Sequence, residues 1–271
     1  MNRFHSSMSW NAASSAGSTD PETIKDESER GEFRLDDLSW SSLAAQRSFF
    51  LPLHFTSTYE YPLLVWLHSN GHNENQVDYV MPHISLRNYI AVGVRGTFAA
   101  DSAGHRYLWR QSPASLAAAQ ESVASAIEEA CDRYPIHTQR IVLAGYGMGG
   151  TMAMRIAMQE PQRFAGVVSL GGRFPTGSIR NVEQWRQRRM PMLWQWGRLN
   201  PLFSNDELKS DYRSLMTIGG QVEVRQYPGD DEMDTVVLSD LNDWIMRRIV
   251  SGSSIADSDL WATSPTQYSS N

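Results

Sequence analysis

The 271-residue sequence has a single cysteine, Cys131, so it cannot form an internal disulfide bond, a four-cysteine zinc site or an iron–sulfur cluster. It also lacks any apolar run near the roughly 20 residues that a membrane-spanning helix needs, and its mean hydropathy is −0.42. The segment from Met1 to Thr19 is polar and has no apolar core typical of a secretory signal. These absences predict a cytoplasmic protein that does not enter a membrane.

The sequence has no excess of positive charge either. Its formal net charge is −6, and the segment from Thr19 to Asp37 carries −5 of it, with eight acidic residues against three basic ones. The rest of the chain is close to neutral, whereas a nucleic-acid-binding domain needs a basic face. We therefore expect no nucleic-acid partner.

Composition divides the chain into three regions. Residues 1–44 form an acidic, serine-rich tail and residues 252–271 a second serine-rich tail, and we expect both to be largely disordered because neither has a sustained apolar period. Leu260 and Trp261 leave open that part of the second tail docks on the folded chain. Residues 45–251 have the size of one large α/β domain.

Within this domain, apolar runs of strand length alternate with helical patterns. The strand-length runs are Ser48–His54, Pro62–Leu67, Tyr89–Arg95, Arg140–Ala144, Ala165–Leu170, Met192–Trp196 and Val222–Tyr227. The clearest helical patterns are Pro113–Tyr134, Thr151–Gln159 and Thr235–Val250, the first with Ser112 as its N-cap. This alternation predicts a mostly parallel sheet with helices on both faces. Ligands bind such sheets beyond the carboxyl ends of the strands.

The loop Gly145–Gly150, which follows one of these strands, matches three known devices to different degrees. Its glycines fit the dinucleotide pattern G-x-G-x-x-G, but the next strand, which ends at Gly172, lacks the acid that holds a ribose. A phosphate-binding P-loop needs a lysine before Thr151, and Gly150 stands there. The nucleophile elbow G-x-S-x-G fits with one substitution, since Gly147 occupies the serine position.

Together with the elbow, four other segments resemble the phospholipase/carboxylesterase family of α/β-hydrolases, the esterase group that includes dienelactone-hydrolase-like proteins. They are Leu64–Gly71, similar to a strand with the H-G-x-G oxyanion loop, Val92–Gly96, similar to the next strand, Trp196–Pro201, similar to H-G-x-x-D-P, and Tyr227–Glu232, similar to Y-P-G-x-H-E. The resemblance runs from about Phe49 to Arg248. It implies an α/β class protein with a three-layer α/β-hydrolase fold, and a family activity on carboxylic esters.

The residues at the family's catalytic positions differ from the expected triad. Carried over by position, the serine falls on Gly147, the aspartate on Asn200 and the histidine on Asp231, or on Asp230 if the alignment slips by one. Glycine has no side chain to attack a carbonyl, and neutral asparagine cannot stabilise an imidazolium. None of the seven histidines follows His137, so a Ser…Asp…His order is impossible for any serine at or after the elbow.

The resemblance also implies which other residues surround the old site. The oxyanion hole would use the backbone amides of Asn70 and Met148, although Ser69 replaces a glycine of the family's loop. Residues expected to line the pocket are His68, Ser69, Tyr107, Trp109, Tyr146 and Asp230. The acids at 230–232 fit either a solvated turn or recognition of a cationic group.

Three further patterns have plain structural interpretations. His68 and His72, with Glu74 nearby, have a spacing that binds metal on a helix, but the glycine and asparagines between them indicate a loop, so we predict no metal. Cys131 falls on the apolar face of a predicted helix and is expected in the core. The arginines at 180, 186, 188 and 189 predict a solvated helix face, with an anion or partner patch as the alternative.

We therefore predict a pseudo-hydrolase that uses no cofactor and binds a small-molecule ligand or a protein partner at the old active-site crevice, in an oligomeric state that the sequence leaves open. One alternative is an active carboxylesterase or phospholipase-type hydrolase with a rearranged site, for example a serine of a neighbouring loop with Asp231 as base. The other is a nucleotide-dependent enzyme, which tight binding of NAD or ATP would establish.

Overall fold

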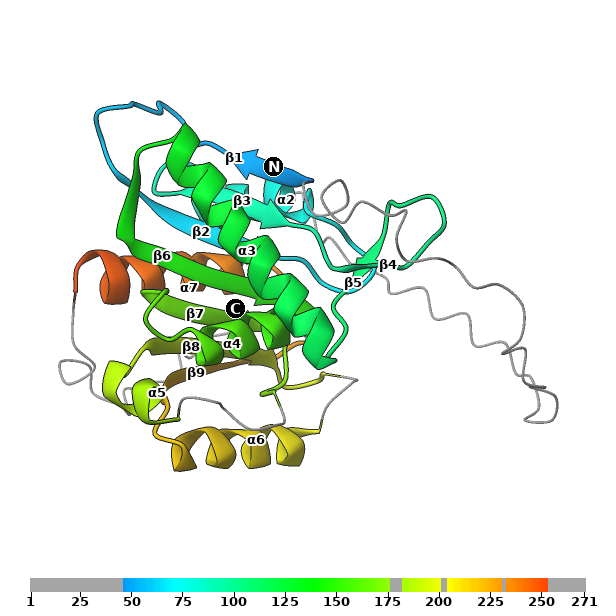
Figure 1. Ribbon diagram of the computed structural model, residues 1–271. Coiled ribbons are helices and arrows are strands. Elements are labelled where there is room, and N and C mark those ends of the chain that lie inside the picture. The colour runs from blue at the N-terminus through cyan, green and yellow to red at the C-terminus, as the bar shows by residue number, and fades with distance from the viewer. Residues whose placement is uncertain (1–45, 176–181, 201–203, 231–232, 253–271) are drawn as a thin grey trace, which may run out of the picture.

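The computed structural model describes residues 46–175, 182–200, 204–230 and 233–252. Its centre is a seven-stranded sheet in the order β1-β3-β2-β6-β7-β8-β9 (Figure 1). The strands are β1 (Arg47–Phe50), β2 (Tyr61–Leu67), β3 (Ile90–Val94), β6 (Ile136–Tyr146), β7 (Gly166–Leu170), β8 (Pro191–Gly197) and β9 (Gln221–Tyr227). All neighbouring strands run parallel except β1 and β3, which confirms the predicted mostly parallel sheet.

Helices cover both faces of the sheet, as predicted (Figure 1). They are α2 (Gln76–Ile84), α3 (Pro113–Arg133), α4 (Met148–Gln159), α5 (Val182–Arg188), α6 (Asn205–Thr217) and α7 (Thr235–Ile245), which continues into the π-helical turn η1 (Met246–Val250). A short hairpin of β4 (Phe98–Ala99) and β5 (Tyr107–Leu108) follows β3. In the part of the chain that the structure describes, no helix combines the length and the apolar character needed to cross a bilayer.

Strand β2 shows how one apolar run supplies two cores. Leu63, Val65 and Leu67 pack in the cluster that α3 and α4 share. Leu64 and Trp66, which point to the other face because side chains alternate along a strand, pack in the cluster of α2 and α7. All five side chains are fully buried. A strand covered on both faces therefore reads as a continuous apolar sequence.

Helix α3 begins at Pro113 as predicted and ends at Arg133, one residue before the predicted end, but one of its side chains is not where we expected it. The Ser112 hydroxyl accepts a hydrogen bond from the amide of Ser115 at 3.2 Å, which caps the first turn. The expectation that Cys131 lies in the core is wrong, because its side chain is exposed. The buried stripe of the helix passes through Ala126 and Ala130, and Cys131 is one residue, or about 100°, beyond that stripe.

Candidate active site

The elbow lies at the carboxyl end of β6, where the chain turns sharply into α4. Gly147 has φ 55° and ψ −122°, and its amide donates to the Leu170 carbonyl of β7 at 2.8 Å. The amide of Thr151 in turn donates to the Gly147 carbonyl at 3.1 Å. A residue with a side chain is strained at such a positive φ, whereas glycine adopts it freely. The backbone thus keeps the geometry of a nucleophile elbow without its nucleophile.

The other elbow glycines permit close packing of the helix. A Cβ atom at Gly149 would lie 2.2 Å from the Leu67 carbonyl oxygen and 2.3 Å from that of His68. A Cβ at Gly145 would lie 2.5 Å from the carbonyl carbon of Gly149. Gly149 thus lets the start of α4 pack against the end of β2, and Gly145 lets the end of β6 pack against the start of α4. At Gly147, by contrast, the nearest atom to an added Cβ is the Ser69 Cβ at 3.8 Å, an ordinary contact distance.

The loop after β2 contains His68, a fully buried and neutral histidine. Its Nδ1 donates to the Ser69 carbonyl at 2.7 Å, and its Nε2 accepts from the Gly96 amide at 2.8 Å. Removal from water lowers the pKa of His68 to about 4, with the backbone bond to Ser69 opposing the shift. Because both ring nitrogens are engaged, the imidazole has no free lone pair for a metal ion or for a nucleophile. In the described ranges, no three potential metal-ligating side chains gather in a cluster.

Gln76 and Trp109 hold the backbone of this loop. The Gln76 side chain accepts from the Ser69 amide at 3.1 Å and donates to the Ser69 hydroxyl at 3.2 Å. Trp109 donates its indole N–H to the His68 carbonyl at 2.7 Å and its backbone amide to the Asn70 side chain at 3.0 Å. The Ser69 hydroxyl therefore interacts with a neutral amide, which cannot act as a catalytic base.

A buried ion pair between Arg95 and Glu74 lies next to the loop that follows β2. Arg95, which follows β3, donates from Nε to Glu74 at 2.6 Å and from its guanidinium to the Tyr107 hydroxyl at 3.1 Å. Glu74 and Tyr107 are both 5% exposed. We expected Tyr107 and Trp109 to line the pocket, and instead they are buried supports of the loop. The Glu74 carboxylate, which lies near His68 and His72 in the sequence, is the partner of Arg95.

The two loops that carry the other triad positions lie against each other. Asn200 follows β8 and Asp230 follows β9, and the amide of Leu199 donates to the Gly229 carbonyl at 2.9 Å. A Cβ at Gly197 would lie only 2.1 Å from the Asp230 carbonyl oxygen, so the β9 loop crosses directly over the end of β8. The elbow, Asn200 and Asp230 thus share the carboxyl edge of the sheet. Asp231 itself lies outside the described residues.

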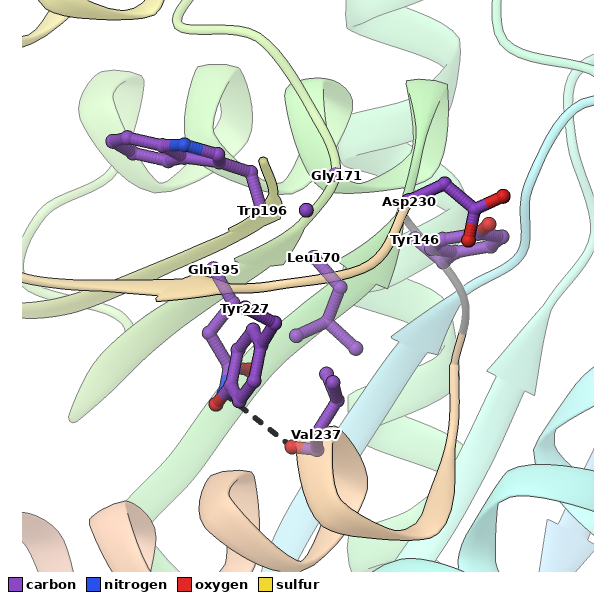
Figure 2. Close-up of a pocket in the computed structure, with 9 residues that line it drawn as sticks. Tyr146, Leu170, Gly171, Gln195, Trp196, Tyr227, Asp230 and Val237 are labelled. Carbon is purple, nitrogen blue, oxygen red and sulfur yellow. Dashed lines mark hydrogen bonds between the residues drawn. The ribbon is translucent and has the colours of Figure 1, made fainter. Parts of the chain in front are cut away.

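A small cavity opens at this edge, between the ends of β7, β8 and β9 and the start of α7 (Figure 2). Its lining includes Tyr146 and Asp230 but not His68 or Ser69, which belong to the neighbouring loop. The other lining residues are Leu170, Gly171, Gln195, Trp196, Gly197, Tyr227 and Val237. The space that a water molecule's centre can occupy is about 10 Å³, which is room for about one water.

A hydrogen-bonded chain that sequence analysis missed forms the floor of this cavity. Gln195 donates to the Val237 carbonyl at 3.3 Å (Figure 2). It also donates to the Tyr227 hydroxyl at 2.6 Å, and Tyr227 in turn donates to Asp240 at 2.6 Å. Burial and the neighbouring Asp240 carboxylate raise the pKa of Tyr227, so its phenol stays protonated at neutral pH. No local motif marks this chain, because its members come from β8, β9 and α7.

A hydroxyl and an imidazole do meet elsewhere on the surface. The Thr235 hydroxyl of α7 lies 3.2 Å from Nδ1 of His83 in α2. Both residues are exposed, and neither belongs to the cavity lining. The pair thus lacks the enclosure in which a serine-hydrolase-type nucleophile operates.

Comparison with known proteins now adds to this geometry. The sequence profile of the family described as Phospholipase/Carboxylesterase matches residues 72–249, which is more than half of the chain and includes the elbow and both later triad positions. The chain belongs to the phospholipase/carboxylesterase family. The resemblance seen in the sequence is thereby confirmed. No curated protein sequence gives a significant match.

Solved structures share the fold at low sequence identity. A carboxylesterase from Bacillus cereus is 16% identical with a TM-score of 0.59, over 74% of this chain and 92% of that one. SOBER1 from Arabidopsis thaliana is 19% identical with a TM-score of 0.58, over 69% and 99% of the two chains. The fluorophosphonate-binding serine hydrolase FphF from Staphylococcus aureus is 15% identical with a TM-score of 0.54, over 73% and 91%. These likenesses support the three-layer α/β-hydrolase fold.

Proposed function

We propose that this family member lacks serine-hydrolase catalysis and binds a small ligand or a protein partner at the crevice where its relatives carry the active site. The observation that carries this proposal is Gly147. It stands at the strand-to-helix turn, with the backbone geometry of the nucleophile, and it offers only a hydrogen atom to a substrate. Covalent catalysis of ester hydrolysis needs a nucleophilic oxygen or sulfur at this point.

The base side of the triad supports the same proposal. Asn200 is neutral, and the sequence has an acid, Asp231, where the family has its histidine. His68, the buried histidine of the loop after β2, has both ring nitrogens hydrogen-bonded to backbone groups and so cannot replace the missing histidine. Serine proteases whose catalytic triad has been removed still accelerate the reaction about 10³–10⁴-fold over water through the oxyanion hole and substrate binding. This acceleration is far below that of an enzyme with an intact triad.

What the crevice retains is suited to binding rather than to chemistry. Tyr146 and Trp196 provide aromatic walls, and Asp230 places a carboxylate in the lining. The amides of Asn70 and Met148 stay the predicted donors for a carbonyl or carboxylate oxygen. Because the enclosed space holds about one water molecule, a short-chain carboxylic acid or ester would lie across the mouth of the cavity, with its oxygen at these amides and its chain beside the aromatic rings.

The experiment is fluorophosphonate labelling alongside turnover of p-nitrophenyl butyrate. We expect no labelling and only background turnover for the native chain. The variant Gly147→Ser/Asn200→Asp/Asp231→His tests the family origin of the crevice, because gain of labelling at residue 147 would show that the old geometry persists.

Two control variants address the alternative of a rearranged hydrolase. Ser69→Ala removes the hydroxyl of the residue whose Cβ lies nearest to an added Cβ at Gly147, and Thr235→Val removes the hydroxyl beside His83. Labelling of the native chain that either variant abolishes would refute the proposal and establish that hydroxyl as the nucleophile. For the binding half of the proposal, calorimetric titration with hexanoate is expected to give saturable heat that Tyr146→Ala and Trp196→Ala reduce at least severalfold.

A further inference from the structure

A groove of about 400 Å³ lies at the opposite edge of the sheet from the crevice. Its walls come from the segment before β2, represented by Leu53 and Tyr59, from Arg87 before β3, and from Met246 and Val250 of η1. These are the amino ends of the parallel strands and the carboxyl end of the last helix. The groove is therefore separate from the site of the proposed function.

The groove exposes apolar side chains that the fold nevertheless holds in place. Leu53 is 52% exposed and Tyr59 is 48% exposed, and Phe55 lies beside them with 37%. The rings of Tyr59 and Tyr61 meet edge to face with centroids 4.8 Å apart, and those of Phe55 and Tyr61 stack at 5.6 Å. A contiguous apolar patch of ordered side chains on a protein surface marks a site of interaction.

The path of the chain favours one occupant. Val250 is a wall of the groove, and the described chain ends two residues later at Gly252, so the 19 residues that follow start at the rim. The other tail joins the fold across the sheet, because Arg47 of β1 pairs with Val94 at the carboxyl end of β3. Of the two tails, the C-terminal one thus begins beside the groove.

The sequence of this tail fits the chemistry of the groove. Its large apolar residues gather in Ile255–Trp261, which also contains Asp257 and Asp259. Arg87 lines the groove, and its guanidinium forms no ion pair with the described part of the chain. Leu260 is eight residues beyond Gly252, and an extended chain of that length reaches about 26–29 Å. Apolar side chains and a neighbouring carboxylate can therefore enter the groove together.

We propose that the C-terminal segment Ile255–Trp261 of the same chain binds in this groove, with Leu260 and Trp261 covering the exposed apolar side chains and the two aspartates facing Arg87. We call this segment the strap, and its proposed site is the groove at the amino ends of the strands. Burial of the two large side chains offsets the conformational entropy that the segment loses on binding.

Hydrogen exchange of the full chain tests the strap directly. The readout is the segment Pro52–Tyr61, in which the Phe55 amide donates only to the nearby Pro52 carbonyl, at 3.2 Å, so its exchange can report on cover by the strap. We expect its amides to exchange about tenfold faster in the full-length variant Leu260→Ser/Trp261→Ser. A chain that ends at Gly252 should show the same increase. Tyr268→Ser, a matched change in the same tail outside the strap, should leave the exchange unaltered.

A charge swap tests the ionic half of the proposal. Arg87→Glu should raise exchange in Pro52–Tyr61 severalfold, and adding Asp257→Arg/Asp259→Arg should restore most of the protection. Equal exchange in the native chain and in Leu260→Ser/Trp261→Ser would overturn the proposal. Protection that disappears on dilution, together with a dimer in light scattering, would also overturn it, since the tail would then bind a second copy. Failure here leaves the labelling result at the crevice unaffected.

Discussion

Substitution of Gly147 by alanine measures the backbone strain that any residue with a side chain has at the elbow position. The residue has φ 55° and ψ −122°, a conformation that costs a residue with a Cβ on the order of 1–3 kcal/mol. The added Cβ meets nothing closer than the Ser69 Cβ at 3.8 Å, so no steric overlap contributes. Alanine also restricts the unfolded chain, which returns about 0.4–1 kcal/mol. The net loss of unfolding free energy should be about 1–2 kcal/mol.

Urea denaturation measures this loss, and the slope with denaturant should stay unchanged because the surface exposed on unfolding is the same. In thermal unfolding the same loss corresponds to a decrease of roughly 2–8 °C for a domain of this size. Gly229→Ala, in the loop after β9, is the matched control, because an added Cβ there has nothing within 4 Å, and its effect should stay within about 0.5 kcal/mol. Gly149→Ala should cost more than Gly147→Ala, since its Cβ would lie 2.2 Å from the Leu67 carbonyl oxygen. A neutral Gly147→Ala, or one as damaging as Gly149→Ala, would refute the reasoning.

Three further outcomes follow from the described contacts. Because the pKa of His68 falls from its usual 6.5 to about 4 in the folded chain, the unfolded chain takes up the proton first as pH falls, and about 3 kcal/mol of stability should be lost between pH 6.5 and 4. In urea titrations across that range, His68→Gln should lack this part of the pH dependence, and a slope identical to that of the native chain would contradict it. Glu74→Gln leaves the Arg95 guanidinium buried without its carboxylate and should cost about 3–5 kcal/mol in denaturation, whereas Asp206→Asn, at an exposed pair with Lys209, should cost under about 1 kcal/mol. Cys131 is exposed, so a thiol reagent should label one equivalent of the folded chain. Labelling should be slower than that of a free thiol, because partial burial and Asp132 raise the pKa of the Cys131 thiol. Labelling only after unfolding would contradict the exposed position of Cys131.

Much of the fold could be predicted because its signals are local. The apolar run that ends at Leu67 and the helix capped by Ser112 are each written in a short stretch of sequence, and the structure has both. Helix α6 also begins with a local signal, since Ser204 and Glu207 form a capping box. Helix α2 has no comparable sequence signal, because it starts among asparagines and contains Pro82.

The residues around the site divide in the same way. The empty nucleophile position at Gly147 was visible because glycines at fixed spacing mark a turn. The support of Ser69 by Gln76 and the link from Gln195 through Tyr227 to α7 were not visible, since each joins side chains whose proximity arises only when the sheet is assembled. The prediction that Cys131 is buried was wrong for a related reason. Helical periodicity indicates which face of α3 is buried, but it does not indicate which residues lie at the boundary between the buried and exposed faces.

The two tails join the sheet at opposite edges, and this arrangement matters for anyone who attaches the protein to a surface. Residue 46 precedes β1, whose first residue pairs with the carboxyl end of β3, so a linker or fusion partner placed there lies at the same end of the strands as the crevice. Gly252 leaves from the far edge, next to Val250. Immobilisation for ligand screening therefore suits the C-terminus, where the tether and the screened pocket are separated by the full length of the strands.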